Sequence, residues 1–193
     1  MKYLTLIRHA KSSWKDSGGT DIERVLNPRG ERDCLHMGRT IARELPVPAM
    51  ILGSNAQRVR QTVARLTDVA GRTAEEARAA AREAKAVLRP EDDAPGAGAY
   101  PEPEWREQLY LADAETLWDI AYSALLEVDE VWICAHNPGI TEAIEVCTGS
   151  RLENVPTLGV CRIAFEELVP AGANGTLVFY ATPRNHAQRG DKS

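Results

Sequence analysis

The stretch LTLIRHAKSSW, residues 4–14, joins a short apolar run directly to an arginine and a histidine. Residues 2–7 are apolar and partly β-branched, which predicts a buried strand. Arg8 and His9 follow where this strand is expected to end. In a parallel sheet, ligands bind beyond the carboxyl ends of the strands. The pair is therefore a candidate for part of a functional site.

The order of strand, loop and helix repeats along the rest of the chain. Further apolar runs predict strands at residues 49–54, 130–135, 159–166 and 176–182. Helical patterns lie among them, at residues 27–45, 56–71, 114–126 and 140–148. This alternation predicts an α/β fold. We expect a three-layer αβα sandwich, with a mostly parallel central sheet and helices on both faces.

Capping residues and helix breakers indicate where the helices begin and end. Asn27 suits an N-cap, and Pro28 suits the first position of the helix that follows. The apolar face of that helix is expected to include Leu35 and Met37. Gly71 is expected to end the second helix.

The middle of the chain, residues 71–104, has an unusual composition. Residues 73–88 are rich in Ala, Glu and Arg and predict a solvated helical extension. Residues 89–104 contain four prolines, two glycines and five acidic residues, which is typical of a mobile linker or lid. We expect one domain over residues 1–183, and a disordered polar tail over residues 184–193.

Composition excludes several classes of partner. The 193 residues suit a single domain. The net charge of −5 and the pI of about 5.5 argue against nucleic acid, which calls for a basic face. No apolar run approaches the ~20 residues that span a bilayer, so no membrane partner is expected. Arg8 and His9 interrupt the first apolar run, so we expect no signal peptide and a cytoplasmic location. Nothing indicates a coiled coil, and we expect a monomer.

The four cysteines form no CxxC pair. In a reducing compartment such residues behave as small apolar side chains. We therefore expect four buried thiols and neither a disulfide nor a zinc site: Cys34, Cys134, Cys147 and Cys161.

Three of the predicted strands end in residues that suit phosphate chemistry. Arg8 and His9 follow the first strand. Arg58 closely follows the second, and His136 follows the strand at residues 130–135. A guanidinium group binds phosphate in a bidentate manner, and a neutral imidazole can attack phosphorus. We therefore predict that His9 attacks a phosphoryl group that Arg8 helps to hold.

At this point the sequence resembles a known family. The Arg-His-Ala of LIRHAKSSW resembles the Arg-His-Gly motif of the histidine phosphatase superfamily, with Ala10 in place of the glycine. Four more stretches are similar to segments of its SixA-like phosphohistidine phosphatase branch: DIERVLNPRG (21–30), SNAQRVRQT (54–62), EQLYLA (107–112) and AHNPGI (135–140). They occur in family order and span residues 2 to about 165.

The resemblance implies a phosphoglycerate mutase-like fold and a phosphatase that uses neither a metal nor a cofactor. It implies four catalytic residues: His9 as the phosphorylated nucleophile, His136, Arg8 and Arg58. It implies that the phosphate-binding residues are Arg8, Arg24, Arg58, His136 and Asn137. The residues alone leave two alternatives open. A salt bridge to Asp21 or Glu23 explains Arg24 nearly as well, and Asn137 can serve only to orient its loop.

The mechanism that we expect has two steps, phosphoryl transfer to His9 and hydrolysis of phospho-His9 by water. Many members of the superfamily also carry a glutamate as general acid, at a position where this chain has Leu111. Glu107 is the nearest carboxylate and is a candidate substitute. A missing acid limits alkyl phosphates but matters less for a phosphoramidate. This difference favours phosphohistidine on a protein as the substrate.

Two other functions remain open. The segment at residues 71–104 could cover the site and supply an acid such as Glu102 or Glu104, which would suit a small phosphorylated metabolite. A module that binds phosphate without turnover is the alternative of another class. The complete set of histidines and arginines argues against that alternative.

Overall fold

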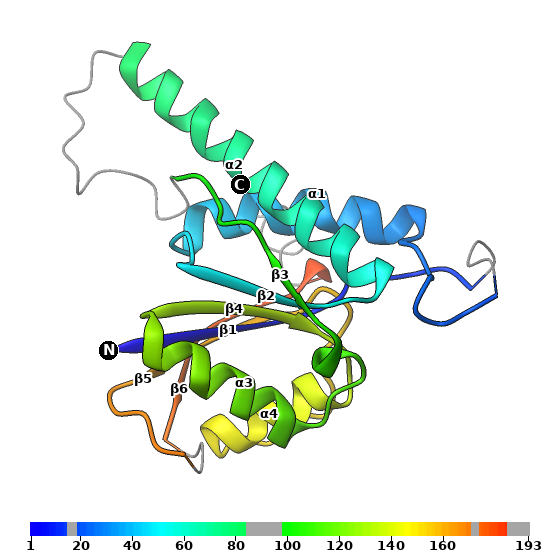
Figure 1. The fold of residues 1–193 in the computed structure, drawn as a ribbon. Helices are drawn as coiled ribbons and strands as arrows, with labels where there is room; N and C mark the ends of the chain where they lie inside the picture. Colours follow the sequence, from blue (N-terminus) through cyan, green and yellow to red (C-terminus); the bar gives the residue numbers. More distant parts are fainter. Residues whose placement is uncertain (15–18, 84–97, 171–173, 185–193) are drawn as a thin grey trace.

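The computed structural model describes residues 1–14, 19–83, 98–170 and 174–184 (Figure 1). They form one six-stranded sheet in the order β3-β2-β4-β1-β5-β6. The strands are β1 (Lys2–Arg8), β2 (Met50–Ser54), β3 (Glu104–Arg106), β4 (Glu130–Ala135), β5 (Val160–Phe165) and β6 (Thr176–Ala181). Strands β1 to β4 pair with one another in parallel. Strand β5 pairs in antiparallel fashion with both β1 and β6.

Helices cover both faces of the sheet. They are α1 (Pro28–Glu44), α2 (Gln57–Glu83), α3 (Ala114–Glu127) and α4 (Gly139–Thr148), and a short 3-10 helix, η2 (Glu107–Leu109), follows β3. Figure 1 shows α1 and α2 on one face and α3 and α4 on the other. The predicted α/β class, the three layers and the mostly parallel sheet are confirmed.

The sheet separates two hydrophobic cores. Because strand side chains alternate between faces, Leu6 and Ile133 pack toward α3 and α4, whereas Ile7 and Trp132 pack toward α1 and α2. The four cysteines are buried and free, as their spacing predicted. No helix within the described ranges is long and apolar enough to cross a membrane.

The first helix begins as predicted. The Asn27 side chain accepts a hydrogen bond from the Gly30 backbone N–H at 2.9 Å, and a proline stands in the first turn. The predicted apolar face is wrong at Leu35, which is 46% exposed. Its neighbour Cys34 is buried instead, because Cys34 lies one helical turn from the buried Met37 on the face toward the sheet.

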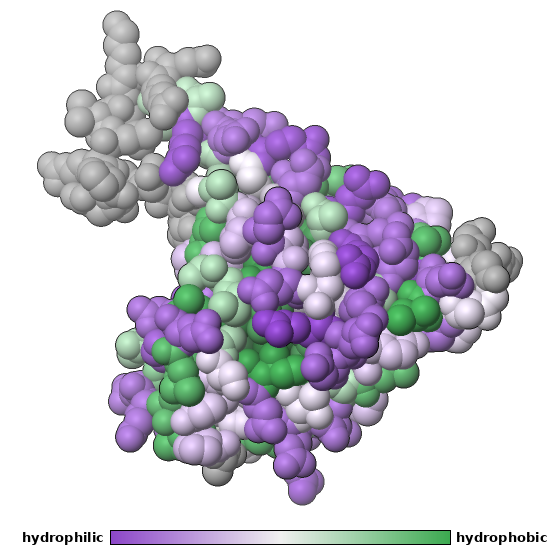
Figure 2. Space-filling model, in the orientation of Figure 1, coloured by the Kyte–Doolittle hydropathy of each residue, from purple (hydrophilic) through white to green (hydrophobic). Residues whose placement is uncertain are grey.

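The second helix is longer than predicted. It continues through Gly71 to Glu83, so the prediction that Gly71 ends it is wrong. The Ala-rich sequence that follows favours helix strongly enough to outweigh one glycine. As far as Glu83, the predicted extension is therefore an uninterrupted continuation of α2. The part of α2 that faces the viewer in Figure 2 is mainly hydrophilic, as a solvated extension requires.

Gly71→Ala is expected to stabilise the protein by about 0.5–1 kcal/mol, because alanine restricts the unfolded chain and a Cβ at Gly71 meets nothing within 4 Å. Gly38→Ala is the matched comparison. There a Cβ would lie 2.7 Å from the Cβ of Val69, so the free energy of unfolding should fall. Urea denaturation of both variants checks the pair. If both substitutions raised the free energy of unfolding, or if neither did, this description of α2 would be contradicted.

The linker predicted at residues 89–104 is described only from residue 98 onward. Residues 84–97 lie outside the described residues, so the mobile part of that prediction is not tested. The end of the segment packs on the domain: the Tyr100 ring lies 5.6 Å from the Trp132 ring, and Glu104 begins β3, which pairs with β2. Most of the predicted tail, residues 185–193, likewise lies outside the described residues.

Candidate active site

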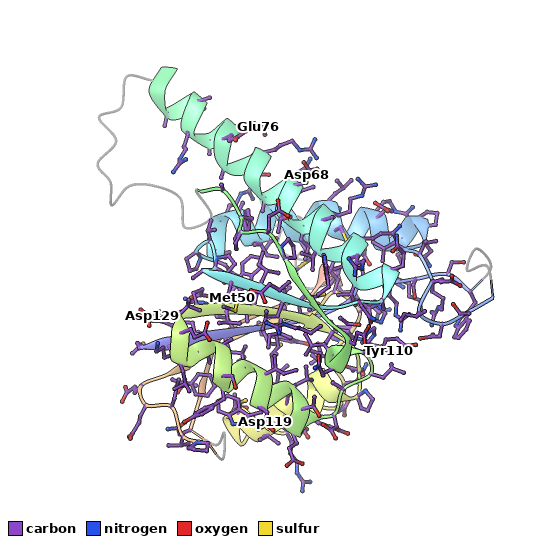
Figure 3. All side chains as sticks on the ribbon, viewed as in Figure 1. Met50, Asp68, Glu76, Tyr110, Asp119 and Asp129 are labelled. Carbon is purple, nitrogen blue, oxygen red and sulfur yellow. The ribbon has the colours of Figure 1, made fainter. Side chains whose placement is uncertain are left out.

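The sheet topology brings the two predicted histidines together. His9 follows β1 and His136 follows β4, and these strands are parallel neighbours. Their rings lie 5.2 Å apart between centroids. Arg58 comes from the first turn of α2, and its Nη2 lies 3.2 Å from His136 Nδ1. In Figure 3, Tyr110 marks this end of the sheet, and Asp129, which precedes β4, marks the other end.

The His9 ring is held in one tautomer. Its Nδ1 lies 2.7 Å from the backbone oxygen of Ala10, which can only accept, so Nδ1 must donate and Nε2 keeps a free lone pair. The Ala10 backbone N–H in turn donates to Thr62 Oγ1 at 3.0 Å, which fixes this loop to α2. Burial lowers the pKa of His9 to about 4; the Ala10 carbonyl opposes this effect, and Arg58, Arg8 and Arg24 add to it. The His9 ring is therefore neutral at pH 7.

His136 is only 1% exposed and has partners at both ring nitrogens. Because Arg58 can only donate, His136 Nδ1 accepts from it, and Nε2 carries the proton toward Ser54 Oγ at 2.9 Å. The pKa of His136 is lowered to about 3, mainly by burial and also by the nearby His9 and Arg58, against the opposing charge of Asp21. The predicted hydrogen bond to a phosphoryl oxygen thus needs a second proton on this ring, which a bound dianion would favour.

The two depressed histidine pKa values predict how stability depends on pH. In the unfolded chain these groups titrate near ~6.5, so below that pH the unfolded state binds protons that the native state does not. Their stabilising contribution is present above about pH 6.5 and is lost as the pH falls toward 4 for His9 and 3 for His136. Acidification therefore favours unfolding.

Replacing His136 with glutamine should flatten this dependence. Each such histidine contributes up to about 1.4 kcal/mol per pH unit to the slope of the unfolding free energy between these limits. Urea denaturation between about pH 6.5 and pH 5 checks this, with the exposed His36→Gln as the control. An equal slope in His136→Gln and the wild type would mean that His136 is not held neutral by the fold.

Asp21 links the arginines of the site to one another. Its backbone oxygen accepts from Arg58 Nη1 at 2.5 Å, and its Oδ2 accepts from Arg58 Nη2 at 2.8 Å. Its Oδ1 accepts from Arg24 Nη1 at 2.9 Å, and Tyr110 Oη donates to Oδ2 at 2.6 Å. Burial by itself would raise the pKa of Asp21, but the hydrogen bonds from Tyr110, Arg24 and Arg58 hold it well below its usual range. Asp21 therefore stays ionised and orients both arginines.

Both interpretations of Arg24 fit the structure. Arg24 forms the salt bridge to Asp21, and its charge also reaches the site, where it lowers the pKa of His9. Its Nη2 donates to Ser12 Oγ at 2.8 Å, and its guanidinium carbon lies 3.8 Å from the centroid of the exposed Trp14 ring. Arg24 is thus held beside the site at the same time as it pairs with a carboxylate.

Within the part of the chain that the structure describes, two arginine donors at the site have no partner. The Nε atoms of Arg8 and Arg58 are both buried and make no hydrogen bond within the described residues. Arg8 Nη1 donates to the backbone oxygen of Val155 at 2.6 Å, which anchors the guanidinium and leaves Nε unpaired. Buried polar groups in folded proteins normally have partners. An oxyanion beside His9 is the kind of ligand that would satisfy such donors.

Asn137 contacts a neighbouring loop. Its Nδ2 donates to Asn154 Oδ1 at 2.6 Å, to Thr141 Oγ1 at 2.9 Å and to the backbone oxygen of Val155 at 3.2 Å. The same loop receives the Arg8 side chain. These are the contacts of a residue that orients a loop, and phosphate binding by Asn137 stays a prediction.

Among the described residues, none of the candidate acids contacts the two histidines through its carboxylate. Glu107 is exposed on η2, and within the described ranges its carboxylate makes no hydrogen bond or ion pair with a site residue. Glu102 is exposed, and the exposed Glu104 pairs with Arg106 at 2.6 Å. From this segment it is the Tyr110 ring that reaches the site, 5.4 Å from the His136 ring in an edge-on arrangement. A general acid at Glu107 stays a prediction.

Sequence reasoning assigned no role to three residues that shape the site: Asp21, Ser54 and Tyr110. Each lies in a stretch that carries the family resemblance, which was the available signal. Asp21 was recognised only as a partner for Arg24. Among the described residues, no group of three or more His, Cys, Asp or Glu side chains is placed to hold a metal ion. Independence from metals stays a prediction.

Known proteins resemble this chain in sequence and in fold. The sequence model of the histidine phosphatase superfamily (branch 1) matches residues 4–92. A chloroplastic protein of Arabidopsis thaliana that is itself uncharacterized is 38% identical over 60 residues, which are 31% of this chain and 28% of that protein. The chain therefore spans less than a third of the length of this curated relative.

Solved structures match the fold over nearly the whole chain. A protein assigned as the phosphohistidine phosphatase SixA of Agrobacterium tumefaciens is 22% identical, with a TM-score of 0.67 over 94% of this chain and 99% of that one. The protein histidine phosphatase SixA complexed with tungstate is 16% identical, with a TM-score of 0.68 over 95% and 98%. Residues 4–92 thus match the histidine phosphatase superfamily in sequence, and the fold of the chain is SixA-like.

Proposed function

We propose that this protein is a phosphatase that forms a phospho-His9 intermediate and acts on phosphohistidine carried by a protein. One observation supports this most: His9 Nδ1 donates to the Ala10 carbonyl, so the neutral ring offers Nε2 as its nucleophilic atom. The partly unpaired guanidinium groups of Arg8 and Arg58 belong to the same site. A fixed nucleophile among fixed cations suits phosphoryl transfer.

The proposed reaction has two steps. In the first, His9 Nε2 forms a bond to phosphorus while the bond from phosphorus to the leaving group breaks. In the second, water attacks the phosphorus of phospho-His9, the P–N bond breaks, and inorganic phosphate leaves. In both steps Arg8 and Arg58 neutralise charge on the phosphoryl oxygens. A dianionic phosphoryl group beside His136 would raise the pKa of that ring and allow it to donate a hydrogen bond as well.

The site offers a poor proton donor, which favours a substrate whose leaving group needs no proton from the enzyme. Asp21 is the carboxylate that contacts the site arginines, and its lowered pKa makes it a poor proton donor. An alkoxide leaving group needs a proton in the transition state, whereas the nitrogen of phosphohistidine can already carry one. Proteins assigned as phosphohistidine phosphatases share the fold, which supports the same substrate class.

The test is phosphate release from three kinds of substrate: a phosphohistidine-bearing protein, p-nitrophenyl phosphate and a panel of sugar phosphates. The proposal expects turnover of the first two and little turnover of the sugar phosphates. Strong turnover of sugar phosphates would instead support the small-metabolite alternative and an acid that the described residues do not reveal. Phosphate binding without any turnover would leave the non-catalytic binding module as the better description.

A further inference from the structure

A basic groove of about 310 Å³ adjoins the candidate active site. Arg8 belongs both to the predicted phosphate-binding set and to the lining of this groove. The name "basic groove" is used here for the hollow lined by Arg8, Lys11, Arg29 and Arg184, together with the polar Asn154 and Thr157. A ligand that reaches His9 thus has a second cationic surface beside it.

The backbone holds the cations of the basic groove in place. The Lys11 backbone oxygen accepts from the Asn27 N–H at 3.0 Å, which joins the loop after β1 to the start of α1. Gly30 makes this contact close, because a Cβ there would lie 2.2 Å from the Lys11 oxygen. This contact places Lys11 and Arg29 side by side in the lining of the same hollow. Arg8 is anchored from the other side by the Val155 carbonyl.

The charge of the basic groove is unusual for this chain. The chain as a whole has a net charge of −5, yet no carboxylate is among the described residues that line the groove. Asp33 offsets one cation from outside the lining, at 3.5 Å from Arg29 Nε. The remaining positive charges of the groove repel one another, and a bound anion would relieve this repulsion.

We propose that the basic groove binds a second anionic group of the substrate, a carboxylate or a phosphate, while the phosphoryl group of the same molecule reaches His9. This inference rests on the proposed function, whose site it extends. The second anion can come from an acidic side chain near a phosphohistidine or from a second acidic group of a small molecule. In either case the groove selects among phosphorylated molecules by charge, and the active site supplies the chemistry.

A pair of aryl phosphates tests the groove directly. Carboxyphenyl phosphate and its carboxamide, each with the substituent at the meta or the para position, differ by one negative charge and little else. The wild type should hydrolyse a carboxylate isomer with a kcat/KM at least about fivefold above its carboxamide, because hydrogen bonds to charged groups are worth that much or more. Added salt should reduce the preference.

The preference should depend on the groove cations. In the double variant Lys11→Gln/Arg29→Gln, the ratio of the two kcat/KM values should fall toward one, mainly through KM for the carboxylate. The control is the double variant Arg39→Gln/Arg43→Gln. It removes two exposed cations from α1, the helix that carries Arg29, but outside the groove lining, and it should keep the wild-type ratio. A wild-type ratio near one for both isomers, or a ratio unchanged by the Lys11/Arg29 substitutions, would overturn the proposal.

Phosphohistidine peptides distinguish the two sources of the second anion. Peptides with glutamate beside the phosphohistidine are compared with the same peptides carrying glutamine. A preference for the glutamate peptides that is lost in the Lys11/Arg29 variant supports an acidic protein segment, and a preference confined to aryl phosphates supports a small molecule. If the wild type hydrolyses none of these compounds, the proposed function fails. The groove is then tested separately by calorimetry. The ratio of the binding constants for the carboxylate and the carboxamide should exceed one in the wild type and fall toward one in the Lys11/Arg29 variant.

Discussion

Replacing His9 with glutamine is expected to lower kcat for p-nitrophenyl phosphate at least about a thousandfold, because the variant has no nitrogen able to take the phosphoryl group. Glutamine is close in size to histidine and carries no charge at any pH, so the arginines around it should keep their places. In the wild type, the Ala10 carbonyl and burial keep His9 Nε2 available. Steady-state kinetics at saturating substrate give the measurement.

Two controls make this result specific. His36→Gln replaces an exposed histidine on α1 and should retain wild-type kcat. Binding of inorganic phosphate to His9→Gln, measured by calorimetry, should persist because the arginines remain. A His9→Gln variant that keeps more than about a tenth of the wild-type kcat would show that another group is the nucleophile.

Replacing Arg58 with lysine is expected to lower kcat/KM by about a hundredfold to a thousandfold, the usual effect of losing one fixed donor to a transition-state oxyanion. Arg58 is 2% exposed and contacts Asp21 through two nitrogens and His136 through one. A lysine ammonium keeps the charge but lacks the planar fork that makes these contacts together. The variant therefore tests geometry more than charge.

The comparison for Arg58 is Arg65→Lys on the same helix, where the arginine is exposed and pairs with Glu31. That variant should keep wild-type kinetics, since exposed ion pairs contribute little. Urea denaturation of Arg58→Lys shows whether the fold survives, because Asp21 keeps Arg24 and Tyr110 as partners. A folded Arg58→Lys protein with near-normal kcat/KM would contradict the role given to Arg58.

The part of the site that could be predicted is the part that topology dictates. His9 and His136 each follow an apolar run, and parallel neighbouring strands must deliver such residues to the same edge. Arg58 could be predicted in the same way from the end of β2. The contact between Asp21 and Tyr110 could not, because it joins two loops 89 positions apart and no periodicity encodes it.

The predictions for α2 and β3 were wrong for the same physical reason. Neighbouring residues and tertiary pairing outweighed the local sequence signal in each case. Glycine often ends a helix, but Gly71 lies in a run of strong helix formers, and the helix continues through it. The three residues of β3 are too few to show alternation, and the prolines before them indicate a loop. Tertiary pairing with β2 makes them a strand. The extent of the domain, the cytoplasmic location and the monomeric state stay predictions.

The most direct test of the phospho-His9 mechanism is to trap the intermediate. Wild-type protein is mixed with p-nitrophenyl phosphate, quenched in alkali within a turnover, digested and mapped by tandem mass spectrometry. The mechanism predicts an acid-labile phosphoryl group on His9, formed at least as fast as turnover and absent from His9→Gln. A phosphoryl group on another residue, or turnover with no phosphorylated protein at any time, would contradict it.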